Sequence, residues 1–387
     1  MAEQTLKVLH LVCEPGRTEA LETAGALSRY AADRAEQLEV DLWAPKEPAG
    51  TEPRNSAAAA GVTRRGLRST LALRSHILRT RTRLVHCHDP HGAAAVASLK
   101  ETGHMPPACY TVYAPLLEEG PSRPLADAAR KAFARLLRRY MDGIIAPSAF
   151  ARGLVISQGA FRPEKVHRVT RGVSAPGRPR RKRADQAGRP DGEARGHRRR
   201  EGHPEPPAVL LLPVNVPQER RRRFVNYFLQ AARILHARAA EAELLLPCPR
   251  VDAAFVRETG HRLGLEGAVR VEALEDLPGL VERCAVAVLP TEDIRGISPL
   301  LEAMAAGKAV VAPDLGGVRE FIDGRSSGQL VRPGDAQALG QALAGLVSSE
   351  AARRSLGGGA ARAAARDFSL EQMARELTAV YRRLAPR

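Results

Sequence analysis

Short apolar runs alternate with amphipathic stretches along most of the chain. The first run, KVLHLV at 7–12, predicts a strand, and the segment after it, 18–33, has apolar residues at helical spacing. Strands that alternate with helices are typical of βαβ units in a parallel sheet. Further strands are predicted in LEVDLWAP, RLVHCHD, ACYTVYA, GIIAPS and VHRVT, and further helices over roughly 65–80, 92–102, 124–140 and 149–158.

The alternation stops and then resumes at AVLLLPV, residues 208–214. Later strands are predicted in AELLLPC, VRVEA, AVAVLPT, AVVAPD and SGQLVRP, and later helices in RFVNYFLQAARILHAR, SPLLEAMAAG, VREFIDG, DAQALGQALAGLVSS and SLEQMARELTAVYRRLA. At 387 residues the chain is long enough for two domains of ordinary size. We therefore expect an α/β protein of two doubly wound, parallel-sheet domains that face each other across a cleft.

Residues 174–207 interrupt this pattern, because they are rich in Pro, Gly and Arg and contain no apolar run. Such a composition predicts a linker or insertion without a packed core. The domain boundaries expected from it are 1–173 for an N-terminal domain, 174–207 for the basic linker and 208–368 for a C-terminal domain, with a final helix over 369–387.

The charge is strongly positive, with 59 Lys and Arg against 43 Asp and Glu. Ten basic and three acidic residues lie within 178–200 alone. A positive field favours anionic partners. Aromatic residues make up only 4% of the chain and do not interleave with the basic segment, so nucleic acid is not favoured. We interpret 178–200 as a solvated linker, with a tether to an anionic membrane surface as the functional alternative.

Neither a membrane span nor a secreted scaffold fits the sequence. No apolar run reaches about 18 residues, and the N-terminus lacks a signal-peptide pattern. The five cysteines are scattered without paired spacing, as expected for reduced thiols. We expect a cytoplasmic protein, with peripheral contact to the inner face of the membrane through 178–200 as the alternative.

The segment 285–335 is the most informative for function, because open parallel sheets bind ligands at the carboxyl ends of their strands. After the strand that ends at Pro290, Ser298 can cap a helix and Pro299 suits its first position. The free N–H groups of a helix start bind phosphate. Glu302, one turn inside, can accept hydrogen bonds from two ribose hydroxyls, although a Glu near a helix start is also favourable on its own.

These residues carry a resemblance to a known family. Leu-Glu-Ala-Met-Ala at 301–305, Gly-Gly at 316–317 with Glu320, and Pro-Gly-Asp at 333–335 resemble the C-terminal domain of family 4 glycosyltransferases, retaining enzymes of GT-B fold. RLVHCHDPHGAAAVAS, GIIAPSAFARGLV and PEKVHRVTRGV in the N-terminal half are similar to that family's other domain, the acceptor side. The resemblance implies that the last helix crosses back onto the N-terminal domain.

The resemblance also implies a reaction. A sugar passes from a nucleotide-sugar donor to an acceptor hydroxyl with retention, without a metal ion or another cofactor. Fixed positive groups then stabilise the leaving diphosphate, and Glu302 corresponds to the residue that holds the ribose. The donor-binding residues expected on this basis are Arg220, Arg223, Ser298, Leu300, Leu301, Glu302, Gly316 and Gly317. The candidate catalytic residues are His88, Tyr113, Glu292 and Asp293.

The chain departs from the family pattern at three places. Ile294 stands where the family has a second Glu that contacts the donor sugar, so Glu292 or Asp293 would have to replace it. Residues 214–217 replace a Gly-Arg, and Tyr113 replaces a His. The alternative is therefore a catalytically weakened nucleotide-binding or scaffold protein of the same fold. The acceptor stays open among lipid-linked or polysaccharide precursors and small metabolites.

The segment HCHDPH, 86–91, offers a competing reading. His86 and His88 lie on one face of the predicted strand, which would allow a metal pair. We favour a different arrangement, in which one His packs near the sheet while His88, Asp89 and His91 line the cleft. No metal site is expected.

Overall fold

The computed structural model divides the chain into two compact units, Met1–Gly172 with Phe368–Arg387, and Val173–Asp367. The described residues are 5–13, 18–33, 38–43, 66–103, 105–112, 124–158, 161–174, 207–214, 216, 218–238, 242–290 and 297–385. Each unit is built on a six-stranded sheet in which all paired strands are parallel. This confirms the α/β class expected from the alternating pattern.

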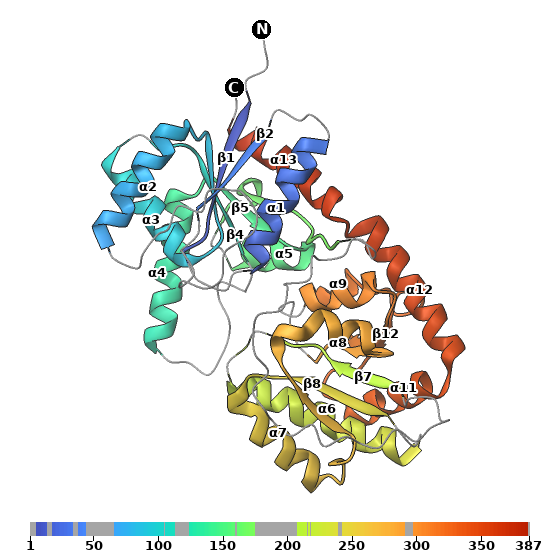
Figure 1. Ribbon diagram of the computed structural model, residues 1–387. Coiled ribbons are helices and arrows are strands. Elements are labelled where there is room, and N and C mark those ends of the chain that lie inside the picture. Colours follow the sequence, from blue (N-terminus) through green and yellow to red (C-terminus); the bar gives the residue numbers. More distant parts are fainter. Residues whose placement is uncertain are drawn as a thin grey trace, which may run out of the picture. The chain divides into compact units, whose positions relative to one another are not determined.

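The first unit has the strand order β2-β1-β3-β4-β5-β6 (Figure 1). Its strands are β1 (Leu6–Leu11), β2 (Leu38–Trp43), β3 (Leu84–Cys87), β4 (Ala108–Thr111), β5 (Gly143–Ala146) and β6 (Val166–Arg168). Its helices are α1 (Thr18–Asp33), α2 (Gly66–Thr80), α3 (Pro90–Thr102), α4 (Pro124–Tyr140), α5 (Ala149–Ser157) and α13 (Leu370–Leu384), with a short 3₁₀ turn, η1, at Pro163–Lys165.

The second unit has the order β12-β11-β10-β7-β8-β9. Its strands are β7 (Ala208–Leu211), β8 (Glu243–Pro247), β9 (Val269–Glu272), β10 (Val286–Val288), β11 (Ala309–Pro313) and β12 (Gln329–Val331). Its helices are α6 (Gln218–Arg238), α7 (Arg250–Arg262), α8 (Leu277–Arg283), α9 (Ile297–Ala305), α10 (Gly316–Arg319), α11 (Ala336–Ser348) and α12 (Glu350–Asp367), with the 3₁₀ turn η2 at Leu274–Asp276.

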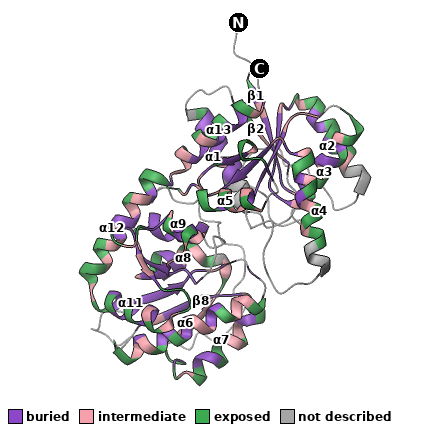
Figure 2. Cartoon of the chain, turned by 180° about the vertical axis from the view of Figure 1, so that it is seen from behind, coloured by how far each residue is buried: buried purple, intermediate pink, exposed green. Residues whose placement is uncertain are grey.

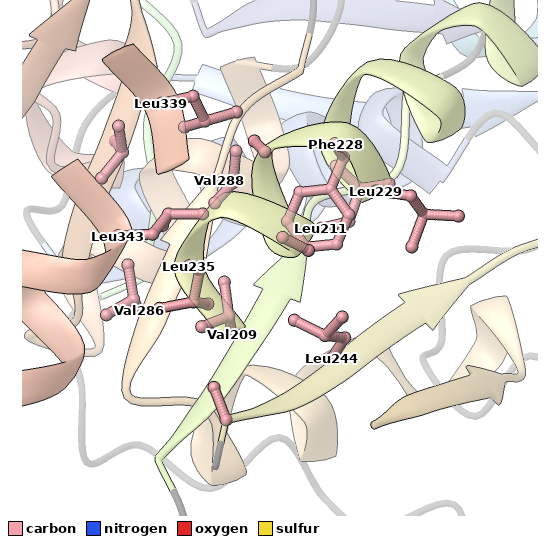
Figure 3. Close-up of a cluster of buried hydrophobic side chains, with 14 of the residues drawn as sticks. Val209, Leu211, Phe228, Leu229, Leu235, Leu244, Val286, Val288, Leu339 and Leu343 are labelled. Carbon is pink, nitrogen blue, oxygen red and sulfur yellow. The ribbon is translucent and has the colours of Figure 1, made fainter. Parts of the chain in front are cut away.

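Each sheet is flanked by helices, and its central strands are buried on both faces, whereas the edge strands β2 and β9 are only partly buried. Figure 2 shows purple strands flanked by helices whose outer surfaces are green. In the second unit, Phe228 of α6, Val209 of β7 and Leu343 of α11 belong to one apolar cluster (Figure 3). This double burial is why the strands were recognisable as continuous apolar runs.

The last helix, α13, belongs to the first unit although the chain before it belongs to the second. Its apolar side, which includes Leu377 and Tyr381, packs with α1 and the sheet face that carries Val8. Gly172 makes the close approach possible, because a Cβ there would lie 2.8 Å from the Cα of Leu370. Helix α13 is therefore an integral layer of the first unit.

Some helices have no counterpart in the sequence analysis, namely α7, α8 and α12. Helix α12 contains SLGGGAARAAARD, whose small residues and arginines leave little apolar periodicity. Its glycines allow backbone contact, since a Cβ at Gly357 would lie 2.0 Å from the carbonyl oxygen of Gly307. The helix predicted in VREFIDG, residues 318–324, corresponds to α10, which begins at Gly316 and already ends at Arg319.

Across the described part of the chain, no helix combines the length and the apolar content needed to cross a membrane. The linker predicted at 174–207 lies almost wholly outside the described residues, and so does the basic segment 178–200.

Candidate functional site

Strand β10 and helix α9 bracket the segment that the sequence marked as informative. Strand β10 ends at Val288 and α9 begins at Ile297, so the helix N-terminus follows the carboxyl end of a central strand. Oriented N–H groups at such a point favour an anion. Glu302, in the second turn of α9, is half-buried. A carboxylate held in this way can accept hydrogen bonds from a bound polyol.

The start of α9 corrects one expectation. The helix begins at Ile297, so Ser298 lies inside its first turn and not at the cap position. The N–H groups without an acceptor in the helix are therefore those at its very start, before Leu300 and Leu301. The side chains of Leu300 and Leu301 are buried in the core, so these two residues present no side chain to a donor.

The helix predicted from Arg223 begins earlier, at Gln218 of α6, so the four arginines 220–223 all lie inside it. Arg221 and Arg222 bond to Asp252 of α7, with Nε···O distances of 2.6 and 3.1 Å. Gln218 donates to the same carboxylate at 2.9 Å. Asp252 is only 1% exposed. Burial alone would raise its pKa, but the hydrogen bonds from Gln218, Arg221 and Arg222 hold the pKa of this carboxyl below its ordinary value.

Two of the four arginines pair with Asp252. Arg221 and Arg222 neutralise Asp252, and the Arg222 guanidinium also lies 4.9 Å from the centre of the Phe255 ring. The two residues predicted to bind diphosphate, Arg220 and Arg223, lie in the same run of arginines at the start of α6. Arg220 is half-buried and Arg223 is exposed. The pairs with Asp252 therefore anchor the helix turn that also carries Arg220 and Arg223.

Gly316 and Gly317 form the first residues of the four-residue helix α10, directly after β11. Asp314, which precedes it, pairs with Arg319 at 2.5 Å. That bond holds the pKa of the Asp314 carboxyl below its ordinary value. The N-cap residue is Leu315, so Asp314 steadies the loop through Arg319 and does not cap the helix. The Gly-Gly pair thus sits on a short, tethered turn at the carboxyl edge of the second sheet.

His88 lies in the first unit, one residue beyond β3, and it is fully buried. It belongs to a cluster with His10 of β1 and His86 of β3, which are also fully buried. His10 and His86 are register partners on neighbouring strands, and His88 lies on the same face as His86. Neighbouring Asp89 is buried too and caps α3 by accepting from the Gly92 N–H.

Hydrogen bonds join the cluster to α13. His10 Nδ1 lies 2.9 Å from His88 Nε2, and His86 Nε2 lies 2.6 Å from Thr111 Oγ1. The Tyr381 hydroxyl lies 2.6 Å from His86 Nδ1 and 3.2 Å from His10 Nε2. Burial lowers the pKa of His10 to about 3. Burial, and secondarily His10, lower that of His86 well below its ordinary value. Both rings are neutral at pH 7.

Among the described residues, this trio is also the candidate group for a metal ion, with ligand atoms within 4.8 Å of one another. Both ring nitrogens of His10 and His86 already have hydrogen-bond partners inside the protein. The ring nitrogens of His10 and His86 are therefore already engaged in hydrogen bonds within the protein. The sequence analysis missed His10, whose signal would have been a polar residue in an otherwise apolar strand.

The remaining catalytic candidates, Tyr113, Glu292 and Asp293, lie outside the described residues. The same holds for Ile294 and for Asn215 and Pro217 of the replaced Gly-Arg segment. Their predicted roles stay predictions. His91, at the start of α3, is exposed, in contrast to buried His88 and Asp89.

Two sequence families match the chain, one in each half. The family described as "Glycosyltransferase Family 4" matches residues 24–175, and that described as "Glycosyl transferases group 1" matches residues 214–349. These matches identify the chain as a glycosyltransferase. Its resemblance to family 4 and its GT-B fold are thereby confirmed.

Relatives of this glycosyltransferase agree with the assignment. A D-inositol 3-phosphate glycosyltransferase of Corynebacterium urealyticum is 33% identical over 132 residues, which is 33% of this chain and 31% of the relative. The match thus spans about a third of that protein's length.

Solved structures share the fold over the whole chain. A glycosyltransferase from Rickettsia africae has a TM-score of 0.72 at 14% identity, covering 99% of this chain and 100% of the other. HepE from Anabaena, solved with UDP and glucose, has a TM-score of 0.66 at 17% identity, covering 97% and 99%. At these identities the likeness establishes the GT-B fold.

Proposed function

We propose that this glycosyltransferase moves a sugar from a nucleotide-sugar donor to an acceptor hydroxyl, with retention at the anomeric carbon and without a metal ion. The second unit binds the donor and the first unit binds the acceptor. The observation that carries the proposal is the β10–α9 connection, where a helix N-terminus follows a central parallel strand and a half-buried Glu302 lies one turn inside.

The chemical difficulty of this reaction is the charge that grows on the leaving diphosphate. Oriented N–H dipoles at the start of α9 and the guanidinium groups of Arg220 and Arg223 supply fixed positive potential for it. The Arg221–Asp252 and Arg222–Asp252 pairs hold the helix turn that carries them. Glu302 accepts from the two ribose hydroxyls, and the short Gly316–Gly317 turn lets the donor approach the backbone.

The choice of the first donor to test comes from a structural neighbour. HepE was solved with UDP, with UDP-glucose, and with UDP and glucose together. We therefore propose a uridine nucleotide as the first candidate, with GDP and ADP as comparisons. Near the donor sugar we propose roles for Glu292, Asp293 and Tyr113. His88, which was expected to line the cleft, is fully buried and bonded to His10, so we assign it no contact with the acceptor.

Calorimetric titration with UDP, GDP and ADP tests the donor site. We expect one of them to bind at sub-millimolar Kd, and Glu302→Ala to weaken that binding by roughly tenfold or more, because a carboxylate that accepts ribose hydroxyls contributes charge-assisted hydrogen bonds. The matched control is Glu350→Ala, which removes an exposed carboxylate from the first turn of α12. Equal affinity in wild type and Glu302→Ala would refute the role of Glu302.

Two further measurements test the finer claims. NMR of the product sugar should show the same anomeric configuration as the donor, and an inverted product would refute retention. Turnover should be the same before and after treatment with a chelator, whereas a loss restored by added divalent cation would refute metal independence.

The alternative, a weakened nucleotide-binding or scaffold protein, is favoured by the replacement of the family's donor-sugar Glu with Ile294. A panel of nucleotide-sugars decides between the two: binding of the free nucleotide with neither hydrolysis nor transfer of any sugar would support the alternative.

The basic segment 178–200 is proposed to tether the protein to an anionic membrane. Its deletion should reduce flotation with phosphatidylserine-containing liposomes while leaving nucleotide affinity unchanged. Unchanged flotation would refute the tether.

A further inference from the structure

Helix α2 turns two leucines toward solvent. Leu71 is 56% exposed and Leu78 is 62% exposed, and among the described residues only two other large apolar side chains, Phe150 and Val251, are exposed. Phe150 and Val251 stand singly on α5 and α7, whereas Leu71 and Leu78 are both on α2. Positions i and i+7 are about two turns apart, so these two leucines lie on the same side of the helix. Apolar side chains that gather on one exposed face indicate a contact surface, whereas single ones are ordinary.

The opposite side of α2 is the one that packs in the first unit. Leu73, His76 and Ile77 are buried there. His76 Nε2 also lies 2.7 Å from Asp41 Oδ2 of β2. At about 3.6 residues per turn, the two exposed leucines lie opposite these three buried side chains. One side thus anchors α2 to the unit, and the leucines project from the side that this packing does not use.

Arginines flank the two leucines. Arg74 and Arg79 are exposed and lie on either side of the leucines around the helix, and exposed Arg81 follows the end of α2. The sequence of α2 contains neither Asp nor Glu. Leucines bordered by arginines are typical of a helix that lies in the plane of a membrane surface, since the alkyl stems reach inward while the guanidinium groups stay among the head groups.

The positive charge continues on the neighbouring helices. Helix α3 contacts both α2 and α4, and the three lie side by side in the first unit (Figure 1, Figure 2). Together they contain nine basic and two acidic residues, and one of the acidic residues, Glu101, pairs with Arg139 at 3.1 Å. On α4 the exposed basic residues recur at helical spacing, at Lys131, Arg135 and Arg138. By contrast, α1 and α13, which pack together in the same unit, contain five acidic and four basic residues.

This combination distinguishes the partners that such a face could bind. A second copy of the chain would bring the same arginines against these, and like charges oppose a symmetric contact. Single-stranded nucleic acid is bound through aromatic side chains, and none of the exposed residues of α2 is aromatic. An anionic lipid surface matches both features, because it attracts the arginines and takes up the leucines. None of the described helices could cross a membrane, so α2 would lie along its surface.

We propose that α2 docks the first unit on an anionic membrane, with Leu71 and Leu78 entering the boundary between head groups and acyl chains and Arg74 and Arg79 contacting lipid phosphates. The basic residues of α4 add attraction without insertion. This contact differs from the tether proposed for 178–200, which contains no apolar run and acts through charge alone. It also does not depend on sugar transfer.

The fluorescence of a tryptophan placed on α2 tests insertion directly. In vesicles of phosphatidylcholine and phosphatidylserine, the emission of Leu78→Trp should shift to the blue and be quenched by brominated phospholipid. Val251→Trp, at a position of α7 that is 63% exposed, is the matched control and should show neither change. Trp43 is buried and common to both variants, so its signal cancels in the comparison. An unshifted, unquenched Leu78→Trp would overturn the proposal.

Vesicle sedimentation measures how much the leucines contribute. Combining Leu71→Gln and Leu78→Gln should lower the partition coefficient by roughly tenfold or more, because two apolar side chains no longer leave water. Glutamine retains good helix propensity, and circular dichroism checks the fold. Val251→Gln should bind vesicles like wild type. The same loss is expected in the protein without 178–200. Equal partitioning of the double variant and wild type would contradict the docking role of α2.

The arginines are tested by the charge of the lipid. Arg74→Gln and Arg79→Gln should each lower binding to phosphatidylserine-containing vesicles by roughly fivefold. Arg354→Gln, on α12 with a side chain that is 79% exposed, should have little effect. Equally strong binding of wild type to pure phosphatidylcholine would refute the role of the arginines. A dimer that forms without vesicle binding, and dissociates in the double leucine variant, would show that a second copy covers this face instead.

Vesicle binding is measured without nucleotide, so it is independent of the donor site. If no nucleotide bound to the protein, the proposed function would fail while the docking result stood. If nucleotides bound but vesicles did not, only the docking proposal would fail.

Discussion

The two units share a sheet architecture but bury different kinds of side chain. Among the described residues, all five buried histidines lie in the first unit, at positions 10, 76, 86, 88 and 167. The buried polar residues of the second unit are Asp252, Thr259 and Ser327. The core of the second unit is made mostly of aliphatic residues, together with Phe224, Phe228 and Phe321 and with Met304, Cys248 and Cys284.

The two cores contribute differently to the stability and to the specificity of the fold. Apolar packing in the second unit gives stability that does not depend on proton binding. The histidine network of the first unit contributes less net free energy, since hydrogen bonds exchange with water on unfolding. It specifies instead how β1, β3, β4 and α13 meet, because an incorrect arrangement would leave buried nitrogens unpaired.

The largest expected effect comes from breaking the apolar core. Phe228→Ala removes a fully buried ring between α6 and the second sheet and should cost about 3–5 kcal/mol in the free energy of unfolding. Urea denaturation measures it. Val251→Ala on α7, where the side chain is 63% exposed, is the control and should change stability by less than about 0.5 kcal/mol. A loss below about 1 kcal/mol for Phe228→Ala would contradict the packing.

Mild acid should destabilise the first unit more than the second. His10 has a folded-state pKa of about 3, against an ordinary value of 6.5, so only the unfolded chain takes up this proton as the pH falls below 6.5. The contribution of such a buried, neutral histidine to the free energy of unfolding is therefore complete above pH 6.5. It decreases toward pH 3 by about 1.4 kcal/mol per pH unit. His86 acts in the same direction.

Trp43, the only tryptophan of the chain, is buried in the first unit and reports its unfolding by fluorescence. Between pH 6.5 and 5 its urea midpoint should fall, while amide exchange in the second unit changes less. Equal losses in both units would show that the histidines do not set the difference.

A smaller effect is expected where the second unit does bury charge. Asp252→Asn removes the negative partner of Arg221 and Arg222 and should cost about 1–3 kcal/mol of unfolding free energy. It should also weaken nucleotide binding, because the helix turn that carries Arg220 and Arg223 loses its anchor. Full stability together with full affinity would contradict the assigned role of the pairs.

The smallest effect should come from the surface. Arg354 and Glu350 form an i,i+4 pair on α12 with side chains that are 79% and 63% exposed. Arg354→Ala should change the unfolding free energy by less than about 0.5 kcal/mol at physiological salt. A cost above about 1 kcal/mol would mean that surface ion pairs also contribute to the contrast between the units.

Much of the architecture could be predicted from local patterns. Strands such as β7 and β11 are short apolar runs between turn signals, and each was expected within one to three residues of its actual bounds. Helix α12 was missed because its GGGA segment carries no apolar period; its packing depends on backbone contact with Gly307, which a linear pattern does not encode. The start of α6 was also misplaced, since arginines are compatible with a helix as well as with a loop.

For the candidate site, the sequence pointed to Glu302, Ser298 and the arginines 220–223, because helix starts after strands have recognisable residues. It could not assign the arginines individually, since which of them meets Asp252 depends on where α7 packs against α6. It could not find the hydrogen bonds that link His88 through His10 to Tyr381, because His10 and Tyr381 are 371 residues apart in the sequence.

The sequence by itself determined the two parallel sheets and the likeness to glycosyltransferases, and it named a candidate donor site. It could do so because apolar runs and helix-start residues are local patterns that extend over a few residues. Only the tertiary structure decided which polar groups meet in the cores. Those contacts arise when strands align in register and a distant helix packs across them, and their free energy exists only after both have been brought together.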